Sequence, residues 1–140
     1  MSRRSDQRRE AAFALYQHDV TSRPLSDVLP REASNFTRAL AHAAEDYTDE
    51  ADQLIAKHAR GWSIDRIAPL EKAIMRVALT EMIHPDAVPG ESPIPAEGAI
   101  SEAVETSKTF CGADAPKFVN GILNAVLQEL RAQGQPPAQG

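Results

Sequence analysis

The stretch 69-PLEKAIMRVALTEMI-83 decides the fold class of this chain of 140 residues. Its apolar residues recur every three or four positions, which is the period of a helix with a buried face. That face carries Leu70, Ala73, Ile74, Val77 and Ala78, and it is widened by Met75, Leu79 and Met82. Pro69 suits the first turn of a helix, and Pro85 stops it. The stretch therefore predicts a long helix that is largely buried.

The same period extends to both sides of this stretch and predicts further helices. They are expected at 7–20, from 36 to about 58, at 100–111 and from 114 to about 130, with one helical turn inside 22–30. Gly61 is a plausible C-cap, and Asp114 is a candidate N-cap of the last helix with Pro116 in its first turn. The loop 86–98 is rich in proline and glycine. The pattern predicts an all-α fold of six to seven helices.

Short connections favour antiparallel helix pairs, so we expect two small packed helical bundles that share an interface near Trp62. The first is expected at 1–60 with a basic arm and the second at 61–132, followed by a disordered tail at 133–140. Each half alone is too small for a sufficient core, so the two together should form one compact unit.

The composition limits the classes of protein that fit. The chain has 15 Lys+Arg against 20 Asp+Glu, a net charge of −5, and it is 42% hydrophobic, which is typical of a globular protein. Its single cysteine, Cys111, allows no internal disulfide and fits a reducing compartment. No apolar stretch is long enough for a membrane span or a secretory signal. We therefore expect a cytoplasmic protein with no membrane partner.

No residue pattern predicts catalysis. The four histidines lie in separate segments without an i,i+4 pair, which argues against a metal site, and there is no glycine-rich phosphate loop. Cys111 is interpreted as a small apolar filler, because no basic partner is related to it by spacing. We expect no enzyme, no metal and no cofactor.

The placement of charge is more informative than its sum. The first nine residues contain four arginines and a single aspartate; the arginines are Arg3, Arg4, Arg8 and Arg9. Such a basic arm can bind phosphates or simply improve solubility. Lys108 and Lys117 form a second small basic group close to Phe118. Five carboxylates between 45 and 52 form either a solvated helix face or a docking surface for a basic partner.

Three separate stretches resemble the NusB family of bacterial transcription antitermination factors. The strongest is 117-KFVNGIL-123, which is similar to the family's signature helix start. The second combines 61-GWSIDRI-67 with 70-LEKAIMRVA-78 and Glu81-Met82, and the third is 8-RREAAFALYQ-17. The resemblance covers residues 8–130 in order. The chain departs from the family in a longer loop before Ile100 and in Asp6 and Gln7, where many relatives are more basic.

The resemblance implies a protein without catalytic activity that binds the boxA element of ribosomal RNA leader transcripts. It would do so with NusE, a protein of the small ribosomal subunit, in a complex that helps RNA polymerase to read through terminators. The implied contacts with single-stranded RNA are Arg8, Arg9, Tyr16, Lys117 and Phe118; Arg3, Arg4 and Lys108 are added by charge. The implied contacts with NusE are Asp65 and Glu71. Five neighbours of these residues are assigned to packing alone: Ala11, Ala12, Val119, Gly121 and Ile122.

Two other functions remain open at this point. The acidic remainder of the chain also fits a helical protein-interaction module that makes no contact with RNA. The fold further resembles the RNA-binding domain that is fused to some ribosomal RNA methyltransferases, of which this chain would be a stand-alone relative. The sequence leaves the oligomeric state undecided.

Overall fold

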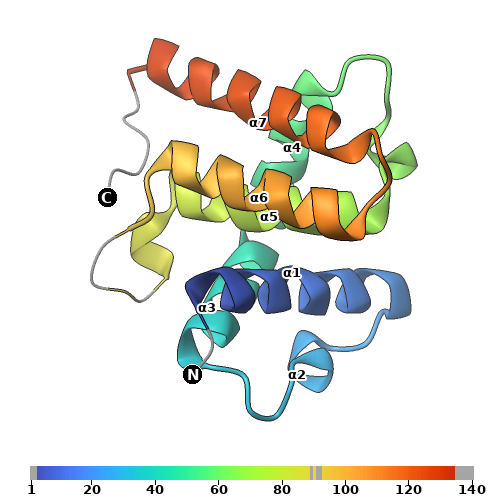
Figure 1. Cartoon of the computed structure of the whole chain (residues 1–140), viewed down its shortest axis with the longest axis vertical. Helices are drawn as coiled ribbons and strands as arrows, with labels where there is room; N and C mark the ends of the chain where they lie inside the picture. Colours follow the sequence, from blue (N-terminus) through green and yellow to red (C-terminus); the bar gives the residue numbers. More distant parts are fainter. Residues whose placement is uncertain (1–2, 89, 91–92, 135–140) are drawn as a thin grey trace.

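The computed structural model describes residues 3–88, 90 and 93–134. These residues form seven α-helices and two 3-10 turns and contain no β-strand, so the predicted all-α fold is confirmed (Figure 1). In chain order the elements are α1 (Arg4–Thr21), α2 (Leu25–Val28), α3 (Asn35–Asp46), α4 (Thr48–His58), η1 (Ile64–Arg66), α5 (Pro69–Ile83), η2 (Pro85–Ala87), α6 (Ala96–Phe110) and α7 (Ala115–Ala132).

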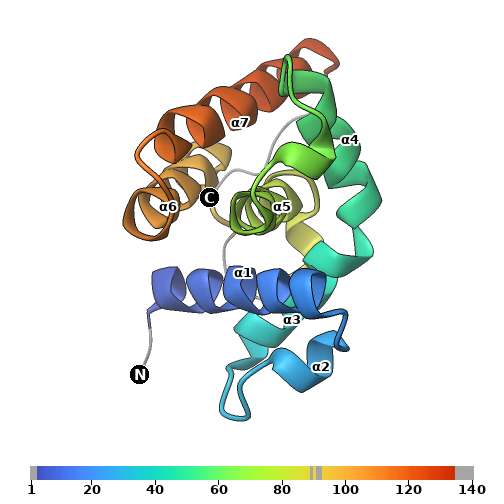
Figure 2. The same ribbon diagram turned by 90° about the vertical axis from the view of Figure 1, so that its right-hand side faces the viewer.

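Helix α5 is the centre of the molecule, as its apolar pattern predicts. Ten consecutive residues, Ala73–Met82, are buried, and the helix contacts α1, α3, α4, α6 and α7. Figure 2 shows α5 almost end on, with the other long helices around it. Because residues 73–82 of α5 are buried, the charged side chains among them need partners inside the protein. Arg76 donates two hydrogen bonds of 2.8 Å to the carboxylate of Asp52 on α4.

The predicted single helix from 36 to about 58 is wrong, because the structure breaks it at Tyr47. This residue has φ −100° and ψ 18°, and its ring stacks on His84 just after α5, with centroids 3.7 Å apart. The sequence has no glycine or proline there, so the cause is tertiary. Helix α3 packs mainly on α1 and also contacts α5, whereas α4 packs on α5 and α7 (Figure 2), so the break lies where the chain passes from the first set of neighbours to the second.

The acidic run 45–52 lies on both sides of this break, and much of it is used inside the protein. Glu45 lies 3.0 Å from His18 of α1, and Glu50 hydrogen-bonds His84. A third carboxylate of the run holds the buried arginine of α5. These pairs fasten α3 and α4 to their neighbours, so the run is more than a solvated face. Its role as a docking surface stays a prediction.

One continuous core joins the two predicted halves. The cluster of buried residues extends from Ala11 to Leu130 and includes Ala59 and Ile67 on either side of the connection after α4. Since the core continues across residue 60, the division into subdomains 1–60 and 61–132 stays a prediction. The predicted interface near Trp62 also stays a prediction; Trp62 itself is 53% exposed. Gly61 reaches φ +81°, and this left-handed turn directs the indole outwards.

The connections differ from expectation at their ends. Within the predicted loop 86–98, α6 already begins at Ala96, while residues 89, 91 and 92 lie outside the described part. Asp114 precedes α7, but its side chain makes no capping hydrogen bond. Of the predicted tail, Gln133 and Gly134 form a turn after α7, and 135–140 lie outside the described residues. No helix in the described part of the chain is long and apolar enough to cross a membrane.

Candidate functional site

The arginines of the predicted arm lie at the start of α1, which begins three residues before the expected Gln7. Arg3 and Arg4 are exposed, and the Arg4 guanidinium lies 4.1 Å from the centroid of the Phe36 ring. Arg9 lies 3.6 Å from Asp6, an ion pair in water that contributes little. The helix therefore presents these three cations on its surface at fixed positions.

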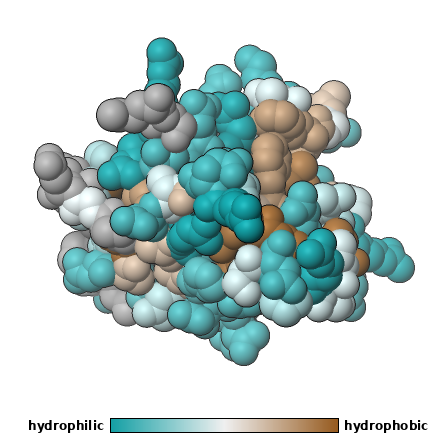
Figure 3. Space-filling model, turned by 90° about the horizontal axis from the view of Figure 1, so that it is seen from below, coloured by the Kyte–Doolittle hydropathy of each residue, from teal (hydrophilic) through white to brown (hydrophobic). Residues whose placement is uncertain are grey.

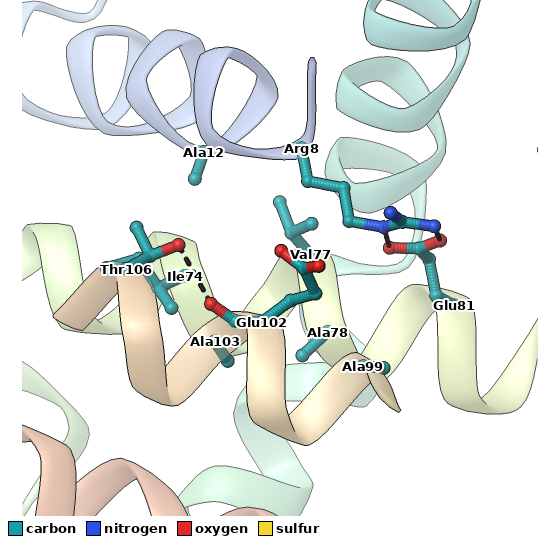
Figure 4. A pocket seen from close by; sticks show the side chains of 10 residues that line it. All are labelled: Arg8, Ala12, Ile74, Val77, Ala78, Glu81, Ala99, Glu102, Ala103 and Thr106. Carbon is teal, nitrogen blue, oxygen red and sulfur yellow. Dashed lines mark hydrogen bonds and ion pairs between the residues drawn. The ribbon is translucent and has the colours of Figure 1, made fainter. Parts of the chain in front are cut away.

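Arg8 points inwards instead. Its guanidinium forms two hydrogen bonds, of 2.7 and 3.0 Å, with the carboxylate of Glu81 on α5, and the two side chains are only 14% and 6% exposed. Figure 4 shows the pair beside a cavity of about 20 Å³ between α1, α5 and α6, whose walls include Ala12, Ala78, Ala99 and Ala103. A buried bidentate pair of this kind fixes the position of α1 on α5. A direct contact of Arg8 with RNA stays a prediction.

An aromatic cluster lies where α1 meets the end of α6. The rings of Phe13 and Phe110 pack edge to face, with centroids 4.9 Å apart and an interplanar angle of 88°. The guanidinium of Arg9 lies 5.8 Å from the centroid of Phe110. Phe110 is 44% exposed, so the cluster presents an aromatic ring and a cation together at the surface. On the face shown in Figure 3, hydrophobic surface is gathered in one region and most of the rest is hydrophilic.

Two more of the predicted RNA contacts lie on the same two helices. Lys108 is in the last turn of α6, exposed and without an ion-pair partner among the described residues. Tyr16 is half-buried and packs against the core from α1, which leaves part of its side chain accessible. The structure thus brings Arg9 close to Phe110, two residues from Lys108, although these residues are far apart in the sequence.

A second aromatic pair lies beyond the connection between α6 and α7. The rings of Trp62 and Phe118 meet at an angle of 68°, with centroids 6.1 Å apart. Beside them is a pocket of about 340 Å³ whose lining also includes Arg66, Glu71 and Asp114. Lys117, in the first turn of α7, is exposed, and none of the described residues forms an ion pair with it.

Glu71 is the half-buried one of the two carboxylates that line this pocket, since Asp114 is exposed. Burial raises its pKa, and among the described residues it has no hydrogen-bond or ion-pair partner. Burial, together with the charge of Glu71, raises the pKa of the Cys111 thiol as well, so the thiol form is favoured and a nucleophilic role is disfavoured. Asp65, the other predicted contact of a protein partner, is exposed on η1 and does not line the pocket.

The connection between α6 and α7 joins the two aromatic clusters. It follows Phe110 directly, and its residues Gly112–Asp114 line the pocket of Trp62 and Phe118. The structure therefore places an RNA-facing candidate, Phe118, and a partner-facing candidate, Glu71, around one hollow.

The residues assigned to packing behave as predicted with one exception. Ala11, Ala12, Val119 and Ile122 are buried. Gly121 is exposed, and a Cβ atom added to it would meet no described atom within 4 Å. The packing role of Gly121 is therefore wrong, because this glycine faces outwards from α7.

Sequence reasoning missed Phe13 and Phe110 as possible functional residues, and it did not assign Trp62 to a site. Phe13 and Phe110 lie at the edges of apolar helical stripes, where one dimension does not separate a buried ring from an exposed one. The one available signal for Trp62 was its position next to Gly61, in a connection rather than in a helix.

Each histidine has a carboxylate neighbour. His18 and His42 lie near Glu45, His58 contacts Glu129, and His84 contacts Glu50. Within the described residues no group of three His, Cys, Asp or Glu side chains could hold a metal ion.

Comparison with known proteins places this geometry in a family. The model of the NusB family matches residues 5–128. The transcription antitermination protein NusB of Symbiobacterium thermophilum is 41% identical over 105 residues, which are 75% of this chain and 65% of that protein. The NusB protein of Halalkalibacterium halodurans is 35% identical over 137 residues, 94% of this chain and 97% of its own length.

Solved structures agree in fold. NusB of T. maritima superposes with a TM-score of 0.78 at 26% identity and covers 91% of this chain and 92% of its own. A chain in a structure of the antitermination factors NusB and NusE with double-stranded RNA superposes with a TM-score of 0.74 at 24% identity, covering 90% and 96%, which is a likeness of fold. The motifs, the helical arrangement and these relatives together show that this chain belongs to the NusB family of transcription antitermination proteins.

Proposed function

We propose that this protein binds boxA-type single-stranded RNA of ribosomal RNA leader transcripts together with NusE, and so promotes read-through by RNA polymerase. It acts in the cytoplasm by binding and not by catalysis. The observation that carries the proposal is the occurrence of an accessible aromatic pair on each side of the α6–α7 connection, with Arg9 beside Phe110 on one side and the exposed Lys117 next to Phe118 in the sequence on the other. Family membership supports the same function.

The chemistry of these residues fits a single strand. Single-stranded RNA is held by cations on its phosphates and by aromatic rings on which unpaired bases stack. Arg3, Arg4 and Arg9 supply cations at one end, and Lys108 and Lys117 supply them near the connection. Tyr16 and Phe118 supply aromatic surface that is partly accessible. Arg8 contributes by holding α1 on α5, and its direct contact with phosphate belongs to the same proposal.

The acidic candidates fit a basic protein partner. Glu71 is a partly buried carboxylate without a partner among the residues that the structure describes, so a cation supplied by NusE would compensate its desolvation. Asp65 is exposed on the neighbouring turn η1 and would add to the attraction. Because Glu71 and Phe118 line one pocket, the protein partner and the RNA would meet there.

The alternative of an interaction module that ignores RNA rests on the acidic run 45–52. Several of its carboxylates are paired with histidines and an arginine inside the protein, which leaves fewer of them free for a partner. The other alternative is a stand-alone relative of the RNA-binding domain of ribosomal RNA methyltransferases. No contact in the structure favours it over the proposed function.

The decisive experiment measures binding of a short boxA-type RNA to the full chain at several salt concentrations, with and without NusE. Arg9→Ala and Lys117→Ala should each weaken binding and reduce its dependence on salt, because each removes a phosphate contact. Arg23→Ala, an exposed arginine after α1, is the matched control. A flat salt response, or equal affinities for all these variants, would contradict the proposal. Glu71→Ala should weaken only the binding that depends on NusE.

A further inference from the structure

Phe110 is exposed more than its chemistry favours. It ends α6, and 44% of its surface is in contact with water, although an aromatic ring gains free energy by burial. Its edge-to-face contact with Phe13 holds the ring in one orientation. The exposed ring therefore offers an accessible π-face next to a second aromatic ring, which is the chemistry that unpaired bases stack on.

The surroundings of the ring are suited to an anion. Arg9 lies 5.8 Å from the ring centroid, and Asp6, its one ion-pair partner in the described part of the chain, is itself well exposed. Such a pair in water contributes little, so the guanidinium can turn to a phosphate at low cost. Lys108 adds a second exposed cation two residues before Phe110.

We propose that Phe110 is a stacking platform for one unpaired nucleobase, with Phe13 as its support and Arg9 as the contact for the adjoining phosphate. The inference rests on the proposed function, since it requires that the protein binds single-stranded RNA. It adds a residue and a ligand: a base on the α1 side of the α6–α7 connection, separate from any base near Phe118. A strand that uses both places crosses this short connection.

The observations favour a nucleobase over an apolar protein side chain. An apolar partner needs a patch without charges, whereas this ring has cations beside it. Paired RNA offers no free base face, so the occupant is a single strand. The ring stacks with any base, because every base has a π-face; the site therefore contributes affinity with little choice of sequence.

The test measures the affinity of the full chain for a short single-stranded boxA-type RNA. Phe110→Ala should weaken binding by about 5-fold to 150-fold, the range for loss of one base–aromatic stack. Phe110→Tyr should retain the affinity, and Phe110→Leu should lose it although its apolar volume is similar. Circular dichroism and thermal unfolding check that each variant is folded. Val20→Ala, which shortens another exposed apolar side chain (49%) on α1, should bind like the wild type.

Two further measurements separate stacking from other effects. Phe110→Ala should leave the slope of log affinity against log salt unchanged, whereas Arg9→Ala should reduce it by about 0.7, the value for one phosphate of a single strand. RNAs with one abasic nucleotide at each position in turn should reveal a position where loss of the base weakens the wild type but no longer weakens Phe110→Ala.

The outcomes are distinct. Equal affinity of Phe110→Leu and wild type would overturn the proposal. It would also be overturned if each abasic RNA weakened binding by the same factor in Phe110→Ala as in the wild type, since no base would then depend on Phe110. Loss of self-association in Phe110→Ala with unchanged RNA affinity would show that a second copy of the chain is the occupant and would also overturn it. If the wild type itself binds no RNA, the proposed function fails, and the inference fails with it for that separate reason.

Discussion

The replacement Arg8→Met should destabilise the protein strongly, because it leaves the Glu81 carboxylate buried without its partner. The lost interaction consists of two short hydrogen bonds, 2.7 and 3.0 Å, to a side chain that is only 6% exposed. Breaking a buried pair by removing one partner costs about 3–5 kcal/mol. For a domain of this size that corresponds to a fall in Tm of roughly 10–20 °C.

The assay is a double-mutant cycle measured by urea unfolding with far-UV circular dichroism. Arg8→Met and Glu81→Met are each expected to be strongly destabilising, whereas the double variant should be close to the wild type, since well-packed apolar groups can replace a buried ion pair. Arg31→Met, at an exposed arginine, is the matched control and should change stability by less than about 0.5 kcal/mol.

Two results would refute this reasoning. One is a cost of less than about 1 kcal/mol for Arg8→Met, because exposed pairs contribute no more than that. The other is a double variant that is as unstable as the sum of the single ones. The double variant also separates two roles of Arg8. If the arginine only holds α1, the folded double variant binds RNA with the salt dependence of the wild type. A smaller slope of log affinity against log salt would identify a phosphate contact of Arg8.

Three further outcomes are expected. Leu123→Ala, at a fully buried position of α7, should cost about 2–5 kcal/mol in urea unfolding, and a smaller cost would show that the core collapses around the gap. Gly121→Ala should stabilise α7 by roughly 0.5–1 kcal/mol, because its Cβ meets open space and alanine favours the helix; destabilisation would contradict the exposed placement. Hydrogen bonds from Lys57 and His58 lower the pKa of Glu129, so its charge stabilises the fold above the ordinary carboxyl pKa, and this contribution is lost as the pH falls through the lowered value. The difference in Tm between Glu129→Gln and wild type should therefore shrink from neutral pH towards about pH 3, and a constant difference would contradict the assignment.

The helices could be predicted because local rules decide them. The stretch from Pro69 to Ile83 carries an apolar period, a proline at its start and another after its end, and the structure follows all three. The break at Tyr47 could not be predicted, because no glycine or proline marks it and the contact of its ring with His84 comes from another part of the chain. Similarly, α6 begins at Ala96 within a stretch whose composition indicates only a loop.

The candidate site shows the same limit at the level of side chains. Charge predicts that the arginines near the start of the chain act as a group, but it does not reveal that Arg8 turns inwards to Glu81 while Arg9 lies over Phe110. Both facts depend on how α1 sits on α5 and α6. The pocket shared by Glu71 and Phe118 is equally a product of packing, because its walls come from two separate helices and the connections before them.

The central position of α5 has a consequence for biosynthesis. Two of the helices that cover it, α6 and α7, follow it in the chain, so they leave the ribosome later. Until then, part of its apolar surface is exposed to water, and such surface is prone to aggregation or capture by chaperones. A chain that stops after Ile83 carries the cations of α1 without the α6–α7 connection. The surface that we propose for RNA includes the α6–α7 connection, so it can form only after α7 has been translated.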